Sequence, residues 1–112
     1  MHWRLAAVLG ATGVALGAFG AHGLKQVIAD PHLLEVWDTG ARYHLVHAVA
    51  VLAACAHPAR PVWAARLWTL GIVVFSGSLY LMALTDLRWL GAITPLGGVA
   101  LIAGWVAVGL GR

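Results

Sequence analysis

Charged side chains are scarce in this sequence. Only 10% of its 112 residues are charged and 62% are apolar, whereas ordinary soluble domains are roughly 25% charged and roughly half apolar. So few charges cannot coat the surface of a water-soluble domain. The composition therefore excludes an ordinary soluble fold and predicts that much of the surface faces lipid.

Basic clusters and paired cysteines are absent as well. The seven Lys and Arg residues occur singly along the chain, so the sequence has no basic patch of the kind that binds nucleic acid. Cys55 is the only cysteine, which excludes a disulfide framework and a thiolate metal cluster within one chain. We expect no nucleic-acid partner.

Long apolar runs are what the sequence has instead. A helix needs about 20 mostly apolar residues to cross the hydrocarbon core of a bilayer, which is about 30 Å thick. Residues 5–24, 67–84 and 89–110 form three such runs without an interior charge. With a fourth span at residues 37–56, we predict one all-α domain over residues 1–112, an integral membrane four-helix bundle with short loops.

The span at residues 37–56 is the polar one. Its purely apolar part, residues 48–56, is too short to cross a bilayer. A full crossing draws Asp38, Arg42 and residues 43–47 into the membrane region, where such side chains usually face a protein interior or a water-filled cavity. Before this span, residues 30–31 are Asp-Pro, which has the form of a helix N-cap followed by proline. That helix could lie in the membrane interface or run straight into the span.

Small residues and proline predict how the helices pack. Four glycines of the first span recur three and four residues apart and so lie on one stripe of the helix: Gly10, Gly13, Gly17 and Gly20. Small residues let membrane helices approach one another closely, so this stripe is expected to be a contact face. In the last span Pro95 cannot donate a hydrogen bond to the carbonyl of Gly91, which predicts a kink there.

The basic residues predict an orientation. If the spans alternate in direction, one side carries Arg4, Arg60, Arg66 and Arg112, and the other carries Lys25, Arg42 and Arg88 with all four acids. The positive-inside rule counts Lys and Arg, not net charge. We therefore predict a multi-pass protein of the cell inner (plasma) membrane with both termini in the cytoplasm.

Polar side chains gather on the other, non-cytoplasmic side. Polar groups in lipid seek one another, because each one left unsatisfied costs several kcal/mol. We predict that they form one ligand-binding pocket, whose candidate residues are His22, Asp38, Arg42, Tyr43, His44, His47, Ser76 and Tyr80. Asp38 and Arg42 are four residues apart and are expected to pair.

The histidines of this set allow several interpretations. His44 and His47 share a helical face, and with His22 they could supply three imidazoles to zinc, copper or iron, or two to a haem. They could instead hydrogen-bond to neighbouring groups and hold the bundle together. A third interpretation is a site for a small polar molecule, a lipid headgroup or a quinone. Their spacing does not choose among these, and the cofactor stays unknown.

Several segments together resemble a known family. They are residues 17–24, 37–40, 43–44, 47–48, 75–80 and 88–98. In these segments the chain resembles the small membrane-protein family of unknown function typified by bacterial YgdD, and the resemblance covers essentially its whole length. It implies a four-helix inner-membrane protein with relatives in eukaryotes, and it implies no activity, substrate or cofactor. Asp86 departs from the family, in which a small residue such as glycine is more usual in this turn.

Three functions remain open. The first is a non-enzymatic membrane protein whose pocket binds a small ligand or lipid, or supports a membrane-protein partner. The second is a redox protein that uses haem or quinone at the histidines. The third is a minimal oligomeric transporter, although the first span has no lone carboxylate to couple protons.

Overall fold

The computed structural model describes residues 3–112, which fold into helices and short connections. The helices are α1 (Trp3–Ala21), α2 (Leu24–Val27), α3 (Pro31–Ala56), α4 (Val62–Gly71), α5 (Gly77–Thr85) and α6 (Thr94–Gly109). A π-helical turn, η1 (Ile72–Ser76), joins α4 to α5, and a 3-10 turn, η2 (Arg88–Ala92), precedes α6. The predicted all-α class is confirmed for the described residues.

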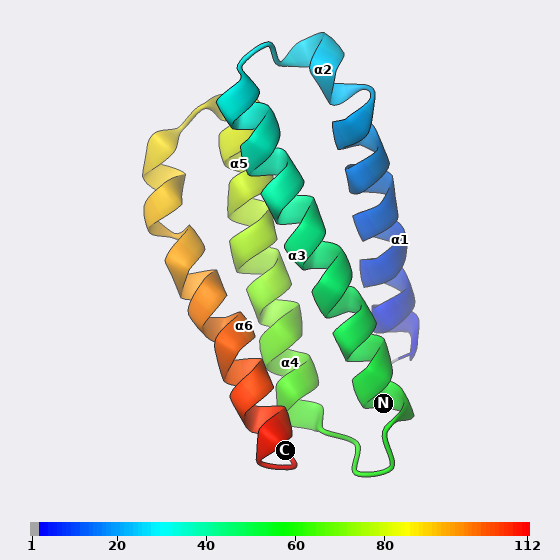
Figure 1. The fold of residues 1–112 in the computed structure, drawn as a ribbon. Coiled ribbons are helices and arrows are strands. Elements are labelled where there is room, and N and C mark those ends of the chain that lie inside the picture. The colour runs from blue at the N-terminus through cyan, green and yellow to red at the C-terminus, as the bar shows by residue number, and fades with distance from the viewer. Residues whose placement is uncertain (1–2) are drawn as a thin grey trace.

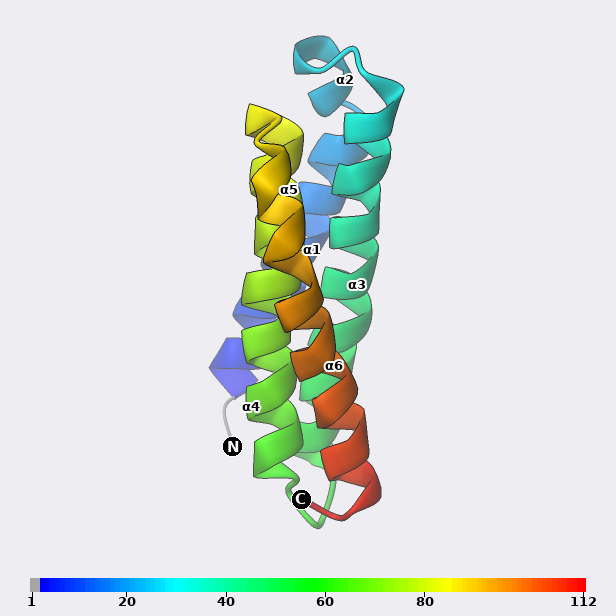
Figure 2. The same cartoon turned by 90° about the vertical axis from the view of Figure 1, so that its left-hand side faces the viewer.

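The long helices form four rods that lie side by side in the order α1, α3, α4–η1–α5 and η2–α6 (Figure 1, Figure 2). Each rod packs mainly on its neighbour in this row: α1 on α3, α3 on α4, η1 and α5, and α6 on α4 and η1. The molecule is therefore elongated and thin, with principal-axis extents of 46 × 26 × 16 Å. Such a row leaves wide apolar flanks, which lipid accommodates because lipid tails are as apolar as the side chains.

The start of α1, the last residues of the chain and the loop at residues 57–61 all lie at the same end of the rods (Figure 1). Here the backbone N–H of Ala64 donates to the carbonyl of Arg112 at 3.0 Å, which links the last residues to the first turn of α4. The opposite end carries α2 and the turn between α5 and η2. The rods thus alternate in direction, and the residues predicted to share a side do share an end.

The second rod begins as its sequence predicts. Asp30 caps α3, because its Oδ1 accepts a hydrogen bond from the backbone N–H of His32 at 2.9 Å, and Pro31 lies in the first turn. From there α3 continues without a break to Ala56. Of the two alternatives, an interfacial piece and a continuous helix, the structure shows the continuous helix.

The last rod changes helix type where the kink is predicted. η2 ends at Ala92, and α6 begins at Thr94 with Pro95 in its first turn, where the missing N–H costs least. The preceding turn holds Asp86 in the left-handed region at φ 54°, a conformation that glycine adopts without steric cost. This explains why a small residue suits the position. In this chain Arg88 Nε donates to Asp86 Oδ1 at 3.1 Å.

The predicted glycine stripe is a close contact over part of its length. A Cβ added at Gly13 would lie 2.9 Å from Leu45 Cδ2, and one at Gly20 would lie 2.5 Å from Trp37 Cδ1. The other two glycines of the stripe would meet nothing closer than 3.8 Å. The backbone of α1 therefore needs glycine against α3 at two positions and not along the whole stripe.

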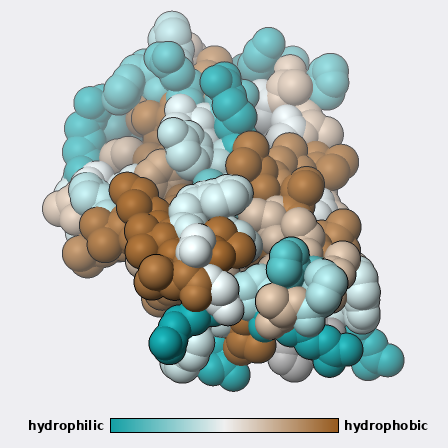
Figure 3. Space-filling view, turned by 60° about the horizontal axis from the view of Figure 1, so that its bottom comes forward, coloured by the Kyte–Doolittle hydropathy of each residue, from teal (hydrophilic) through white to brown (hydrophobic). Residues whose placement is uncertain are grey.

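Three rods are long and apolar enough to cross a membrane: Trp3–Ala21, Val62–Thr85 and Arg88–Gly109. α3 is longer than these, with 26 residues, but carries the polar residues of the second span. Large apolar side chains such as Val14, Val49 and Ile102 are exposed along the rods, and Figure 3 shows broad hydrophobic areas on the molecular surface. Exposed apolar area of this extent marks a surface that contacts lipid or another protein.

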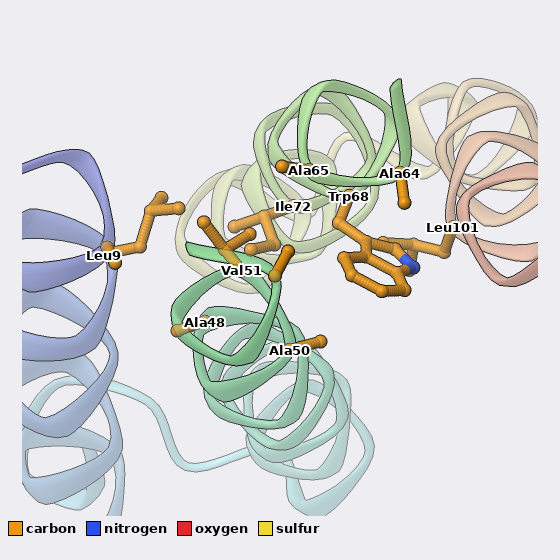
Figure 4. Packing of buried hydrophobic residues seen from close by; sticks show 11 residues of the cluster. Leu9, Ala48, Ala50, Val51, Ala64, Ala65, Trp68, Ile72 and Leu101 are labelled. Atoms are coloured by element: carbon orange, nitrogen blue, oxygen red, sulfur yellow. The ribbon is translucent and has the colours of Figure 1, made fainter. Parts of the chain in front are cut away.

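A hydrophobic core lies where α3, the α4–η1 rod and α6 meet. Val51 of α3 faces Ile72, and the indole of Trp68 extends toward Leu101 of α6 (Figure 4). Small residues line the remaining contacts, among them Ala48, Ala50, Ala64 and Ala65. This core holds the rods together in the half of the molecule that contains the chain ends.

Candidate functional site

Buried polar side chains lie about halfway along the two central rods. His44 and His47 of α3 are each 5% exposed, and Ser76 at the end of η1 is fully buried. Interior polar groups of this kind need hydrogen-bond partners, because water cannot reach them. The partners decide what these residues can do.

His44 connects three rods. Its Nδ1 lies 2.9 Å from Tyr80 Oη on α5, and its Nε2 lies 3.3 Å from Thr12 Oγ1 on α1. The Thr12 hydroxyl donates its one proton to the carbonyl of Val8 at 2.7 Å, so an uncharged His44 must donate from Nε2 to Thr12 and accept at Nδ1 from Tyr80. A chain of hydrogen bonds therefore runs from α5 through α3 to α1.

His47 connects α3 to α6. The indole of Trp105 can only donate, so its Nε1–H donates to His47 Nε2 at 3.0 Å. The other ring nitrogen, Nδ1, lies 2.8 Å from the carbonyl of Tyr43, which can only accept, so Nδ1 carries the proton. His44 and His47 thus have opposite tautomers, and each uses both ring nitrogens inside the protein.

Further hydrogen bonds cross between the rods. Ser76 Oγ donates to the carbonyl of Gly40 at 2.7 Å, which joins η1 to α3. Trp37 Nε1 donates to the carbonyl of Leu16 at 2.9 Å, which joins α3 to α1. Together with the bonds of the two histidines, they connect α3 by hydrogen bonds to α1, to the α4–η1–α5 rod and to α6.

The remaining predicted site residues lie outside this buried set. Asp38 and Arg42 form the expected ion pair, but their side chains are 61% and 74% exposed. His22 follows the end of α1 and is exposed, and Tyr43 is 46% exposed, with its ring against Phe75. The structure therefore buries His44, His47 and Ser76 and half-buries Tyr80. It does not join them with His22, Asp38 and Arg42 in one pocket.

A metal ion or haem does not fit the histidines as they are placed. Among residues 3–112 no group of three His, Cys, Asp or Glu side chains is arranged to hold a metal ion, so the predicted set of His22, His44 and His47 does not form. A ligand bond to His44 or His47 would need a ring nitrogen that already binds Tyr80, Thr12, Trp105 or the Tyr43 carbonyl. The geometry favours the interpretation in which these histidines hold the helices together.

A hollow of about 580 Å³ lies at the end of the rods that carries the loop at residues 57–61, where the sequence predicts no site. We call it the lateral groove, and it is lined by Leu5, Val51, Cys55, Arg60, Val62, Ala65, Arg66, Thr69, Leu70 and Val73. It is open on one side, because α1 packs on α3 and not closely on α4. Figure 3, which is turned toward this end, shows hydrophobic and hydrophilic surface next to each other.

The lateral groove has an apolar body and a basic mouth. Its α4 and η1 residues are spaced three and four apart, which makes them one stripe of that rod, and α3 contributes Val51 and Cys55 as the floor. Arg60 belongs to the loop before α4, and Arg66 lies one turn into α4. A site of this kind suits a molecule with a hydrocarbon part and a negatively charged end.

Sequence reasoning missed three kinds of residue here. Thr12 and Trp105 complete the bonds of the histidines, and a Trp inside an apolar span could have signalled this because its N–H needs a partner. Arg60 and Arg66 were used only to orient the chain. A stripe of α4 in which Ala65 and Thr69 stand among larger apolar residues was the available signal for a groove.

Comparison with known proteins assigns the chain to a family. Residues 16–98 match the family described as "Protein of unknown function (DUF423)". The chain is 46% identical over 110 residues to the UPF0382 membrane protein YwdK of Bacillus subtilis, and the match covers 93% of this chain and 89% of that protein. It is 37% identical over 113 residues to a UPF0382 membrane protein of Schizosaccharomyces pombe, covering 95% and 96% of the two chains. With a UPF0382 membrane protein of Haemophilus influenzae it shares 40% identity over 111 residues, covering 96% and 89%. No solved structure matches it. The chain therefore belongs to the DUF423/UPF0382 family of membrane proteins of unknown function.

Proposed function

We propose that this protein crosses the cell inner membrane four times and has both termini in the cytoplasm, and that its family is the one typified by bacterial YgdD. We propose further that it binds the hydrocarbon chain of a lipid in its lateral groove. The fourth crossing is α3. Its 26 residues extend about 39 Å at 1.5 Å per residue, and it lies between α1 and the α4–η1–α5 rod, both of which are long enough to cross. Its buried histidines face these neighbours and α6, so lipid does not have to solvate them.

In this proposal the buried polar residues have a structural role. Helices in lipid gain little from hydrophobicity, so packing and hydrogen bonds between helices have to supply the association. His44, His47, Ser76 and Tyr80 supply such bonds. Asp38 and Arg42 pair with each other on the exposed face of α3, from which the long Arg42 side chain can extend toward the nearer membrane surface. We assign no catalytic residue and no cofactor to them.

The observation that carries the binding function is the lateral groove. Its volume of about 580 Å³ falls within the range of about 300–1,000 Å³ that is usual for ligand sites. Its lining is mainly aliphatic, and it opens sideways between α1 and α4, toward the surrounding bilayer. A hydrocarbon chain can enter from that side without leaving an apolar environment.

A substitution that fills the lateral groove tests this function. Thr69 faces the groove, and its hydroxyl bonds only back to the carbonyl of Ala65 in its own helix, so Thr69→Phe fills space without breaking a bond between rods. After removal of endogenous lipid, the purified protein is incubated with phosphatidylcholine, and bound lipid is counted by native mass spectrometry. We expect wild type to retain lipid and Thr69→Phe to retain several-fold less.

The matched control is Val99→Phe, which adds an aromatic ring at an exposed position of α6. This variant should bind lipid as wild type does. Equal retention of phosphatidylcholine by wild type and Thr69→Phe would show that the groove is not the binding site.

A further inference from the structure

We propose that the lateral groove prefers an anionic phospholipid, with the phosphate of its headgroup held by Arg60 and Arg66. This inference rests on the proposed binding of a hydrocarbon chain in the same groove. It adds the chemical class of the headgroup, the side chains that recognise it and the leaflet from which the lipid comes.

Among residues 3–112, no acidic side chain pairs with the two arginines at the mouth of the groove. All four acids lie at the opposite end of the row: Asp30, Glu35, Asp38 and Asp86. The ion pairs of the described residues join Asp38 to Arg42 and Asp86 to Arg88, so neither pair involves Arg60 or Arg66. Two guanidinium groups beside an apolar groove are therefore complementary to an anion that is attached to hydrocarbon.

One of these arginines is held at the depth of lipid headgroups. The guanidinium carbon of Arg66 lies 5.1 Å from the ring centroid of Trp63, a cation–π contact that leaves the N–H groups at the edge of the guanidinium available. Trp63 is itself exposed, and exposed tryptophans at helix ends typically lie at the boundary between headgroups and hydrocarbon. Arg66 is thus placed to donate to a phosphate at that boundary.

The other arginine stands in a conformation that glycine would adopt more easily. Arg60 has φ 46°, in the left-handed region, and its backbone N–H closes a turn by donating to the carbonyl of His57 at 3.0 Å. A residue with a Cβ pays a steric cost in this region. A role for the charged side chain at the groove mouth accounts for an arginine here, whereas turn geometry alone does not.

The apolar part of the groove fits within one leaflet. Beyond Arg66 its lining on the α4–η1–α5 rod runs to Val73, which is roughly 10 Å at about 1.5 Å per residue. Half of a hydrocarbon core of about 30 Å is about 15 Å. A phospholipid with its phosphate at the arginines therefore places the first part of one acyl chain along the groove, and with cytoplasmic termini this is the inner leaflet.

Competition between two lipids tests the preference. The full-length protein, freed of endogenous lipid, is mixed with equal amounts of phosphatidylglycerol and phosphatidylcholine that have identical acyl chains, and the bound ratio is measured by native mass spectrometry. We expect wild type to favour phosphatidylglycerol. In the double variant Arg60→Gln/Arg66→Gln the ratio should fall by roughly fivefold for each arginine, while total bound lipid changes little.

The control is the double variant Lys25→Gln/Arg88→Gln, which removes two charges at the opposite end and should keep the wild-type ratio. Arg60 and Arg66 are both exposed, so their replacement should leave the thermal unfolding temperature nearly unchanged. Equal binding of the two lipids by wild type, or an unchanged ratio in Arg60→Gln/Arg66→Gln, would overturn the headgroup preference alone. Binding of neither lipid would instead defeat the proposed function.

Discussion

His44 and His47 lie one helical turn apart, yet they serve different interfaces. His44 accepts from Tyr80 and donates to Thr12, whereas His47 donates within α3 and accepts from Trp105 of α6. A neutral imidazole has one N–H donor and one nitrogen acceptor, and in each histidine both groups have a partner of their own. Because an unsatisfied polar group inside a membrane protein is costly, these complete sets of partners favour a structural role for the two histidines.

Removing one hydroxyl tests this role at the scale of a single residue. Tyr80→Phe leaves the ring in place and removes only the donor to His44, so we expect the free energy of unfolding to fall by about 1 kcal/mol. In a His44→Ala background the same substitution should cost almost nothing, because the partner is already gone. Reversible unfolding in mixed micelles, analysed as a double-mutant cycle, measures the coupling.

Tyr43→Phe is the matched control for this cycle. The Tyr43 ring also packs against aromatic neighbours, but its hydroxyl makes no hydrogen bond within the described residues, so its removal should be nearly neutral. Strictly additive effects of Tyr80→Phe and His44→Ala would contradict a hydrogen bond between the two side chains.

Among the helical elements, the α4–η1–α5 rod is shaped by its contact with α6. The π-helical turn η1 lies against α6, and a Cβ added at Gly97 would lie 2.3 Å from the backbone nitrogen of Phe75. Backbone cannot move aside as the tip of a long side chain can. The absence of a side chain at Gly97 is therefore what allows α6 to lie directly on the π-helical turn.

Two adjacent glycines give a matched test of this contact. A Cβ at Gly98 would lie 3.6 Å from Phe75 Cδ1, an ordinary contact distance. Gly97→Ala should therefore destabilise the protein by about 1–3 kcal/mol, the usual range for overpacking. Gly98→Ala should be neutral or slightly stabilising. Thermal unfolding in detergent compares the two variants. Equal stability of both would show that α6 and η1 are not in backbone contact.

For the whole molecule, the number of crossings depends on α3. Three rods are apolar enough to cross by themselves. In α3 the buried His44 and His47 face neighbouring rods, whereas Asp38 and Arg42 pair with each other on the exposed face. If α3 crosses, the number of spans is even and both termini face the same side. If α3 stays at the surface, the number is odd and the termini face opposite sides.

Reporter fusions distinguish these two topologies. We expect green fluorescent protein to fluoresce and alkaline phosphatase to stay inactive when either is fused at the N-terminus or at the C-terminus. A phosphatase inserted between α2 and α3 should be active, because that connection lies at the opposite end of the row. Termini on opposite sides would disprove the fourth crossing, and two extracytoplasmic termini would reverse the orientation.

Local features of the sequence predicted much of the fold. The apolar runs predicted the all-α class and the places of the long helices, Asp30 and Pro31 predicted the start of a helix, and Pro95 predicted the break before α6. The pairing of Asp38 with Arg42 was also predictable, because the two residues lie one turn apart on the same helix. Each of these features depends on neighbours in the chain, whose geometry the backbone dictates.

Local patterns in the chain account for these features, whereas the packing of the helices fixes which groups on different rods meet. Hydropathy identifies a spanning helix but leaves open how it is rotated and how it is shifted along its axis against the next one. These two quantities place His44 against Tyr80 and Thr12, and they leave His22 exposed at the end of α1. The lateral groove likewise exists because α1 packs on α3 and stays apart from α4. The small residues of the α4 stripe are compatible with a groove, but whether a neighbouring helix fills that space depends on how the rods pack.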